Sequence, residues 1–126
     1  MGTGFKGNSK YYRSIGQNIL ATSSKYEYEN GRFGVCSPST GNKTRNIVSS
    51  DPLKTSIDFY DTIAHGGIEK TYTNKEMKIT YMADGSIITW RAVSNSDGSP
   101  VIDINIKDSS HTGGIKEQKI HFEKEK

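Results

Sequence analysis

The chain contains few of the residues that build covalent or metal-bound frameworks. Cys36 is its single cysteine, so no disulfide can form within the chain. No C-x-x-C pair occurs, and the histidines His65, His111 and His121 are scattered, which argues against a structural zinc site. No apolar run approaches the roughly 20 residues of a membrane-spanning helix. We therefore expect a fold held by a hydrophobic core, with no metal and no membrane span.

The composition indicates one small folded domain. The chain has 126 residues, of which 32% are hydrophobic and 10% aromatic, and its mean hydropathy is −0.70. The core must therefore be small, although the clear apolar periodicities argue against disorder. A net charge of +3 permits a phosphate-rich partner without requiring one.

The first half of the chain is predicted to be mainly helical. Residues 1–8 are rich in glycine and are expected to form a flexible start. Residues 9–65 are expected to form a helical part of the same domain, with a possible hairpin at Asn30-Gly31. Residues 37–45 have the composition of a loop.

Two helices are predicted within this part. The first covers about residues 9–22, where apolar residues recur at helical spacing. The second begins with Ser50 or Asp51 as N-cap and Pro52 as its first helical residue, and it ends before Gly66. Its predicted buried stripe comprises Leu53, Ile57, Tyr60 and Ala64.

From residue 68 to residue 122 the hydrophobic period falls to two, which is typical of strands. The Asp84-Gly85 pair is a hairpin signal between the second and third strand. Helices followed by a meander predict an α+β domain, with N-terminal helices packed on one face of a four- to five-stranded antiparallel sheet. The predicted strands are residues 68–73, 75–82, 86–93, 101–107 and 115–122.

The alternation predicts one apolar and one polar face for this sheet. Ile102, Ile104 and Ile106 point one way, as do Ile120 and Phe122. The residues expected on the opposite face are Arg91, Asp103, Asn105, Lys119 and His121. A histidine, cations and polar partners on an uncovered face are suited to metal-free cleavage of RNA.

Two histidines are the candidate acid and base, and each also has a purely structural interpretation. His65, beside two glycines, is either catalytic or a residue that interacts with the helix C-terminus. His121 is either catalytic or an ordinary surface histidine on an edge strand. Arg91 either binds the phosphate or forms a structural ion pair with Asp103.

Further candidates are predicted around these residues. Ser94, Ser96 and Ser99 are candidate phosphate donors, with Ser94 favoured as a catalytic hydroxyl, although turn formation explains all three equally well. Tyr72, Tyr81 and Trp90 are candidates for base stacking, with Trp90 favoured as a core residue. The predicted substrate-binding residues are Thr89, Ser96, Asp103, Lys119 and Lys78.

Residues 50–122 resemble the C-terminal toxin domains of bacterial polymorphic and contact-dependent growth inhibition toxins. More specifically, they are similar to the barnase, EndoU and colicin D superfamily of ribonucleases (the BECR fold). One departure is that no glutamate base with a matched downstream histidine is evident. The segments that carry the resemblance are Ala64-His65-Gly66-Gly67, Asp84-Gly85, Arg91 with residues 94–100, Asp103-Ile104-Asn105 and Lys119-Ile120-His121-Phe122.

The resemblance implies a cofactor-free endoribonuclease toxin that leaves a 2′,3′-cyclic phosphate, with tRNA as the favoured substrate. It also implies a monomeric toxin that a cognate immunity protein neutralises in a heterodimeric complex. Such a toxin is delivered from the producing bacterium as the C-terminal part of a larger protein and acts in the target-cell cytoplasm. The alternatives are an NAD-consuming toxin, a DNA-cleaving toxin and a non-enzymatic binding module.

Overall fold

The computed structural model describes residues 13–37, 41–94, 98–107 and 109–125. Its helices are α1 (Ile15–Ser23) and α2 (Pro52–Ile63), with the short 3-10 helices η2 (Thr73–Lys75) and η3 (Ser109–Thr112). Its strands are β1 (Tyr28–Glu29), β2 (Arg32–Phe33), β3 (Val35–Ser37), β4 (Gly41–Ser49), β5 (Ile68–Tyr72), β6 (Met77–Tyr81), β7 (Ile87–Arg91), β8 (Val101–Asn105) and β9 (Glu117–Lys124).

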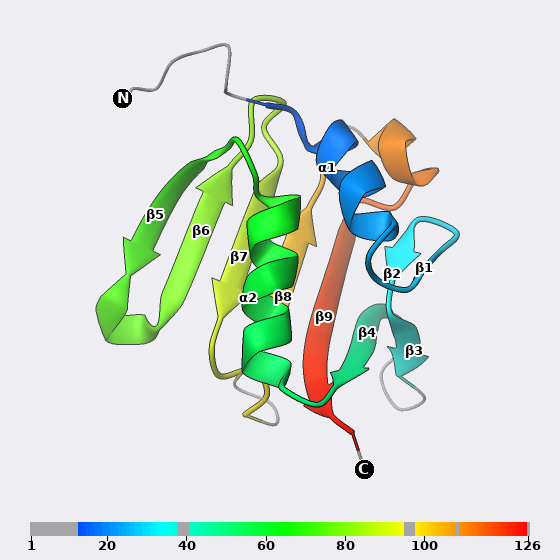
Figure 1. Ribbon diagram of the computed structural model, residues 1–126. Coiled ribbons are helices and arrows are strands. Elements are labelled where there is room, and N and C mark those ends of the chain that lie inside the picture. Colours follow the sequence, from blue (N-terminus) through cyan, green and yellow to red (C-terminus); the bar gives the residue numbers. More distant parts are fainter. Residues whose placement is uncertain (1–12, 38–40, 95–97, 108, 126) are drawn as a thin grey trace.

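The main sheet has seven strands in the order β3-β4-β9-β8-β7-β6-β5, and β1 and β2 form a separate hairpin (Figure 1). Every neighbouring pair in the main sheet is antiparallel except β4 and β9, which run parallel. The α+β class is therefore confirmed, and the five predicted strands are all present. The expected size of four to five antiparallel strands is wrong, because β3 and β4 extend the sheet beyond β9.

Strand β4 lies in a segment that was expected to be a helical part with a loop at residues 37–45. Its sequence is polar and carries no strand-like alternation, so the strand is formed by its place between β3 and β9. Arg45 faces inward and is 8% exposed. Its Nε donates to the carbonyl of Phe33 at 3.0 Å and its Nη2 donates to that of Gly34 at 2.7 Å. These bonds satisfy a buried cation that the sequence alone assigns to a loop.

The first predicted helix is present as α1, which begins at Ile15, and residues 9–12 of the prediction lie outside the described residues. The flexible start expected at residues 1–8 lies outside the described residues. Asn18 of α1 is buried, although the apolar spacing alone did not single it out.

Helix α2 begins as predicted. The side chain of Asp51 accepts a hydrogen bond from the Lys54 amide at 3.2 Å, and Pro52 occupies the first turn. The predicted stripe is wrong at its start, because Leu53 is 46% exposed and Ile57 is 37% exposed. The buried residues of this helix are Ser56, Phe59, Tyr60 and Ile63.

The polar residue in this stripe has a partner in the sheet. Ser56 Oγ accepts a hydrogen bond from Nε1 of Trp90 at 2.9 Å, and the hydroxyl of Tyr60 is hydrogen-bonded to that of Thr80. The buried indole N–H of Trp90 needs an acceptor, so α2 is turned about its own axis with Ser56 over β7. This rotation turns Leu53 away from the core.

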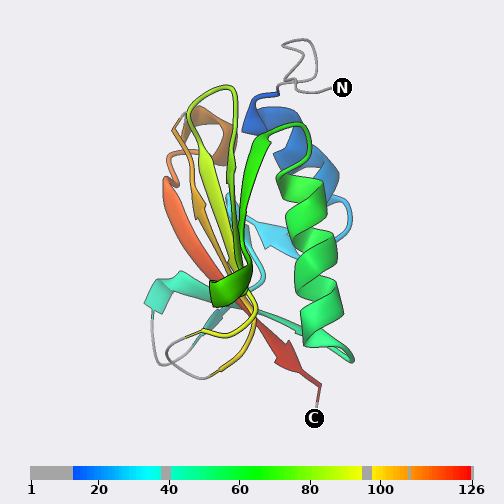
Figure 2. The same cartoon turned by 90° about the vertical axis from the view of Figure 1, so that its left-hand side faces the viewer.

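Helices α1 and α2 lie on the same side of the sheet, as the side view shows (Figure 2). The core forms between them and the inward side chains of the central strands. Asn18 of α1 donates to the carbonyls of Ile63 and His65, both at 2.8 Å, which fixes α1 against the end of α2. The largest side chains that are less than 2% exposed are Tyr60, Phe33, Phe59, Phe122, Ile15, Ile63, Met82, Ile88, Ile102, Ile104, Ile106 and Ile120.

The predicted hairpin at Asn30-Gly31 is confirmed between β1 and β2. Asn30 and Gly31 have φ values of 53° and 85°, as a tight two-residue hairpin turn requires. Gln118 of β9 holds the hairpin, since its Nε2 donates to the Gly31 carbonyl at 3.0 Å and its Oε1 accepts from the Phe33 amide at 2.9 Å. None of the helices in the described residues has the length and apolarity to cross a bilayer.

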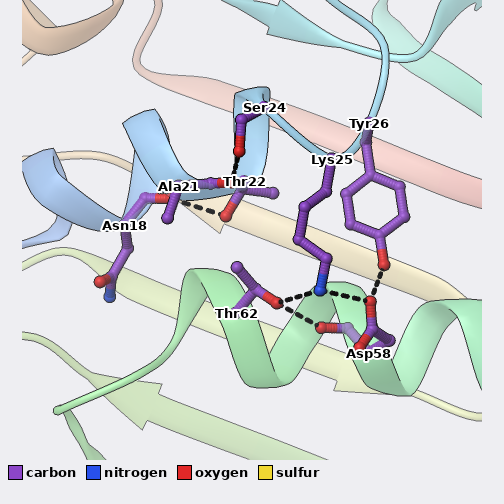
Figure 3. A network of polar contacts seen from close by, with 8 residues as sticks. All are labelled: Asn18, Ala21, Thr22, Ser24, Lys25, Tyr26, Asp58 and Thr62. Atoms are coloured by element: carbon purple, nitrogen blue, oxygen red, sulfur yellow. Dashed lines mark hydrogen bonds and ion pairs between the residues drawn. The ribbon is translucent and has the colours of Figure 1, made fainter.

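A polar network joins the segment after α1 to α2 (Figure 3). Lys25 Nζ lies 3.0 Å from the Asp58 carboxylate, and the Tyr26 hydroxyl donates to the same carboxylate. The bond from Tyr26 and the one from Lys25 lower the pKa of Asp58. Burial, together with the hydrogen bond to Asp58, raises the pKa of Tyr26.

Replacing Asp58 should lower the free energy of unfolding only at pH values at which its carboxylate is ionised. Its pKa is lower in the folded than in the unfolded chain, so its stabilising effect is complete well above pH ~4 and disappears as the pH falls. We expect Asp58→Asn to lower the free energy of unfolding by about 0.2–1 kcal/mol at neutral pH, because the pair is largely exposed. Urea unfolding between about pH 3 and pH 7 should show the difference shrinking towards acid.

Asp61→Asn, on the exposed side of the same helix, is the matched control and should leave stability nearly unchanged. A difference between the Asp58→Asn and parent proteins that stays constant down to the acid limit would contradict this role of the network.

Candidate functional site

The sheet face that points away from α1 and α2 is the candidate site, and we call it the open face. Trp90 and Ile102 point towards the helices and pair with each other, so their neighbours along β7 and β8 point the other way. The polar residues that this alternation places on the open face of β7, β8 and β9 are Thr89, Arg91, Asp103, Asn105, Glu117, Lys119 and His121. The predicted polar face is therefore confirmed.

The strand register arranges these side chains in two adjacent rows. Thr89, Asp103, Lys119 and Thr44 form one row, from β7 across to β4. Arg91, Val101, His121 and Asn46 form the next row. Directly opposed residues on one sheet face have Cβ atoms about 5 Å apart. Residues from four strands are thereby collected within one small area.

Arg91 and Asp103 form an ion pair across the two rows. Nη2 of Arg91 lies 3.2 Å from Oδ2 of Asp103, and their side chains are 24% and 39% exposed. The structural alternative predicted for Arg91 is thus present, and it holds the guanidinium on the open face. A guanidinium has five N–H donors, and this hydrogen bond uses one of them. The pairing is compatible with a second, external anion at Arg91.

His121 is more enclosed than an edge-strand histidine. Strand β9 lies between β8 and β4, and His121 is 6% exposed. Ser99 Oγ lies 2.9 Å from its Nδ1. A hydroxyl can donate or accept, so this contact suits either neutral tautomer of the ring. The ring is enclosed and held in one orientation, so His121 is not the ordinary surface histidine of the structural alternative.

The contact between Ser99 and the imidazole was not predicted, since the sequence suggested Ser99 only as one of three phosphate donors. Ser99 precedes β8, whose first residue Val101 pairs with His121. Only the register of β8 against β9 reveals this, so the composition of the loop could not distinguish Ser99 from its neighbours. Ser94 is 5% exposed, and its amide donates to the Ser99 carbonyl at 2.8 Å, which closes the loop. Ser96 lies outside the described residues.

The structure does not bring His65 to this site. His65 follows α2 on the helix side of the sheet, and its carbonyl is bonded to Asn18. Ile68, at the start of β5, is four strands from β9 and four residues from the row of His121. With about 4.8 Å between strands and 3.4 Å per residue, His65 lies on the order of 20 Å from His121. The two histidines cannot act as one acid–base pair.

Lys78 lies on the opposite face as well. It pairs with Trp90, and its Nζ is 5.7 Å from the centroid of the Trp90 ring, on the helix side. Lys119, by contrast, lies on the open face, directly opposite Asp103 in the register of β8 and β9.

A hollow of about 440 Å³ lies in the open face beside the row of Thr89, Asp103 and Lys119. Its walls combine apolar surface with hydrogen-bond donors and acceptors, as ligand-binding hollows commonly do. Within the part of the chain that the structure describes, no three His, Cys, Asp or Glu side chains are grouped to hold a metal ion. The lining residues are Thr44, Ile87, Thr89, Asp103, Ile104, Asn105, Glu117, Gln118 and Lys119.

The partial exposure of the Arg91–Asp103 pair predicts that it contributes little to stability. We expect a double-mutant cycle with Arg91→Ala and Asp103→Ala to give a coupling free energy of about 0.2–1 kcal/mol in urea unfolding. Each single variant should therefore remain folded. A coupling several times larger would show that the pair supports the fold, and the structural interpretation of Arg91 would then be sufficient.

Comparisons with protein-family models, with curated proteins and with solved structures found no match to this chain. The chemistry of the site must therefore be inferred from the geometry of the open face. That geometry comprises an oriented histidine, a braced arginine and a lysine in two neighbouring rows.

Proposed function

We propose that the protein is an endoribonuclease that cleaves RNA without a metal ion, with its active site on the open face around His121. The observation that supports this most directly is the Ser99–His121 contact in the same row as Arg91. The imidazole and the guanidinium lie in one row, two strands or about 10 Å apart between their backbones, so a proton acceptor and a phosphate-binding cation face the same part of the surface. The NAD-consuming, DNA-cleaving and binding-module alternatives do not use a 2′-hydroxyl as nucleophile.

In the proposed reaction, His121 accepts the proton of the ribose 2′-hydroxyl. The 2′-oxygen then forms a bond to phosphorus, and the bond from phosphorus to the 5′-oxygen breaks. Because the nucleophile belongs to the substrate, this step needs no cofactor. Ser99 keeps the imidazole oriented during the proton transfer, through its contact at Nδ1.

Two cations on the same face complete the proposed reaction. Arg91, braced by Asp103, binds the non-bridging phosphate oxygens, on which charge accumulates in the transition state. Lys119, in the neighbouring row, donates a proton to the departing 5′-oxygen. The products are a 2′,3′-cyclic phosphate and a free 5′-hydroxyl. Thr89 and the hollow beside it receive adjoining parts of the substrate.

The resemblance described above extends this proposal to a biological role. A ribonuclease of this kind would inhibit competing bacteria as the delivered part of a larger toxin, with tRNA as the favoured substrate. A cognate immunity protein would neutralise it in a heterodimeric complex. The α+β class and the open face opposite the helices support the resemblance only at the level of architecture.

We expect RNA cleavage to depend on His121 and Arg91. With total RNA in the presence of EDTA, the parent protein should give fragments ending in 2′,3′-cyclic phosphate. Removal of an acid–base group is expected to lower the rate of His121→Ala by about 10²–10⁴-fold. Loss of the charge at Arg91 should lower the rate of Arg91→Ala by about 10²–10³-fold. Gel analysis with end-group identification measures both rates.

His65→Ala is the matched control, because it removes a histidine from the far side of the molecule and should retain parental activity. Full activity of folded His121→Ala, or cleavage that leaves a 3′-hydroxyl on one fragment and a 5′-monophosphate on the next, would refute the mechanism. If all RNA stays intact while NAD or DNA is consumed, the corresponding alternative function replaces this one.

A further inference from the structure

The open face continues from the candidate site across β5, β6 and β7, away from His121. The register there joins Tyr72, Met77 and Arg91 in one row. The next row contains Lys70, Ile79 and Thr89, and the third contains Ile68, Tyr81 and Ile87. This surface, which we call the tyrosine platform, adjoins the active-site rows without a break.

The charges on the tyrosine platform have one sign. Lys70 and Arg91 are its cations, of which Arg91 is ion-paired with Asp103 of the adjoining β8, and the open-face positions of β5, β6 and β7 supply no carboxylate side chain. On the helix side of the same strands, Glu69 pairs with Thr80. An acidic residue is therefore present in this part of the sheet, but it faces away from the platform. Such a surface complements a polyanion.

The platform also presents exposed aromatic and apolar side chains. Ile68 is 51% exposed and Tyr72 is 36% exposed, and all five residues of β5 are exposed. Lys70 Nζ lies 5.7 Å from the ring centroid of Tyr81, within range of a cation–π contact. A cation beside an accessible aromatic ring matches a nucleotide, which carries a planar base next to a phosphate.

The spacing between Tyr72 and Arg91, within one row, suits a continuous nucleic acid strand. Tyr72 is two strands from Arg91 in the same row, or about 10 Å. This separation is comparable to one or two nucleotides of extended single strand. In a duplex, by contrast, the faces of the bases are stacked on one another and are not available to protein rings.

We propose, on the basis of the ribonuclease function proposed above, that the substrate is single-stranded RNA and that its bases stack on Tyr72 and Tyr81. Lys70 binds the backbone between them. The scissile phosphate then lies at Arg91, and the strand continues towards Lys119. This assigns a substrate class, unpaired RNA such as a loop, to the active site.

The test uses a fluorescein-labelled RNA of about 12 nucleotides with 2′-O-methyl groups, which cannot be cleaved because the nucleophile is blocked. Fluorescence anisotropy gives the dissociation constant. We expect Tyr72→Ala and Tyr81→Ala each to weaken binding by about 5- to 100-fold, the range for loss of one base–aromatic stack. The corresponding Phe variants should bind as the parent does. A duplex of the same sequence should bind at least about tenfold more weakly, because its bases are not free to stack on protein rings.

Two further variants keep the test decisive. Lys70→Glu lies on an exposed edge strand, so it should leave the fold intact while weakening binding and reducing its salt dependence. Thr71→Ala, on the helix side of the same strand, is the matched control and should bind as the parent does. Parental affinity in folded Tyr72→Ala, Tyr81→Ala and Lys70→Glu, or equal affinity for the duplex, would overturn the platform.

The two proposals can fail separately, because binding is measured without cleavage. If the parent protein binds the 2′-O-methyl RNA through the tyrosines but cleaves no RNA, the platform stands and the ribonuclease function fails. If the parent cleaves RNA while the tyrosine variants bind normally, the active site stands and the platform is refuted.

Discussion

The antiparallel pairing of β8 with β9 is the constraint on which the candidate site depends. In the observed register, Ile102 pairs with Ile120 beneath the helices, while Val101 pairs with His121 on the open face. A slip of one residue would move Ile120 and Phe122 to the open face and bury Lys119. Burial of Ile120 and Phe122 at 0% exposure therefore determines where His121 points. The same core that stabilises the fold positions the chemistry.

Helix α2 fixes the remaining part of this arrangement. The hydrogen bond that Trp90 of β7 donates to Ser56 of this helix determines which side of β7 the helix covers. Arg91, the next residue of β7, is therefore left on the other side. Strand β4 completes the site by pairing in parallel with β9, which gives His121 a neighbour in Asn46 and encloses it within the sheet.

Local features could be predicted from the sequence, whereas most long-range ones could not. Alternation along residues 101–106 and 119–122 was sufficient to assign the two faces, because a half-buried strand imposes a period of two. Asp51-Pro52 and Asn30-Gly31 were sufficient to place a helix start and a turn. Strand β4 was missed because its polar residues are held by tertiary pairing and by the buried Arg45, which no local pattern encodes.

The same division between local and long-range features applies to the candidate site. Arg91, Asp103, Lys119 and His121 were grouped correctly, since they lie on strands whose faces can be read from the sequence. His65 and Ser99 could not be placed, because their positions depend on how α2 and the loop before β8 pack against other elements.

The central claim, that the open face at His121 receives the RNA, is tested most directly by NMR of the histidine rings. The ring signals are assigned with variants in which one histidine at a time is replaced, and they are followed during addition of 2′-O-methyl RNA. We predict that the His121 signals shift at saturation, while those of His65, on the far side of the sheet, stay in place. Shifts confined to His65, or bound RNA that leaves the His121 ring unchanged, would contradict the claim.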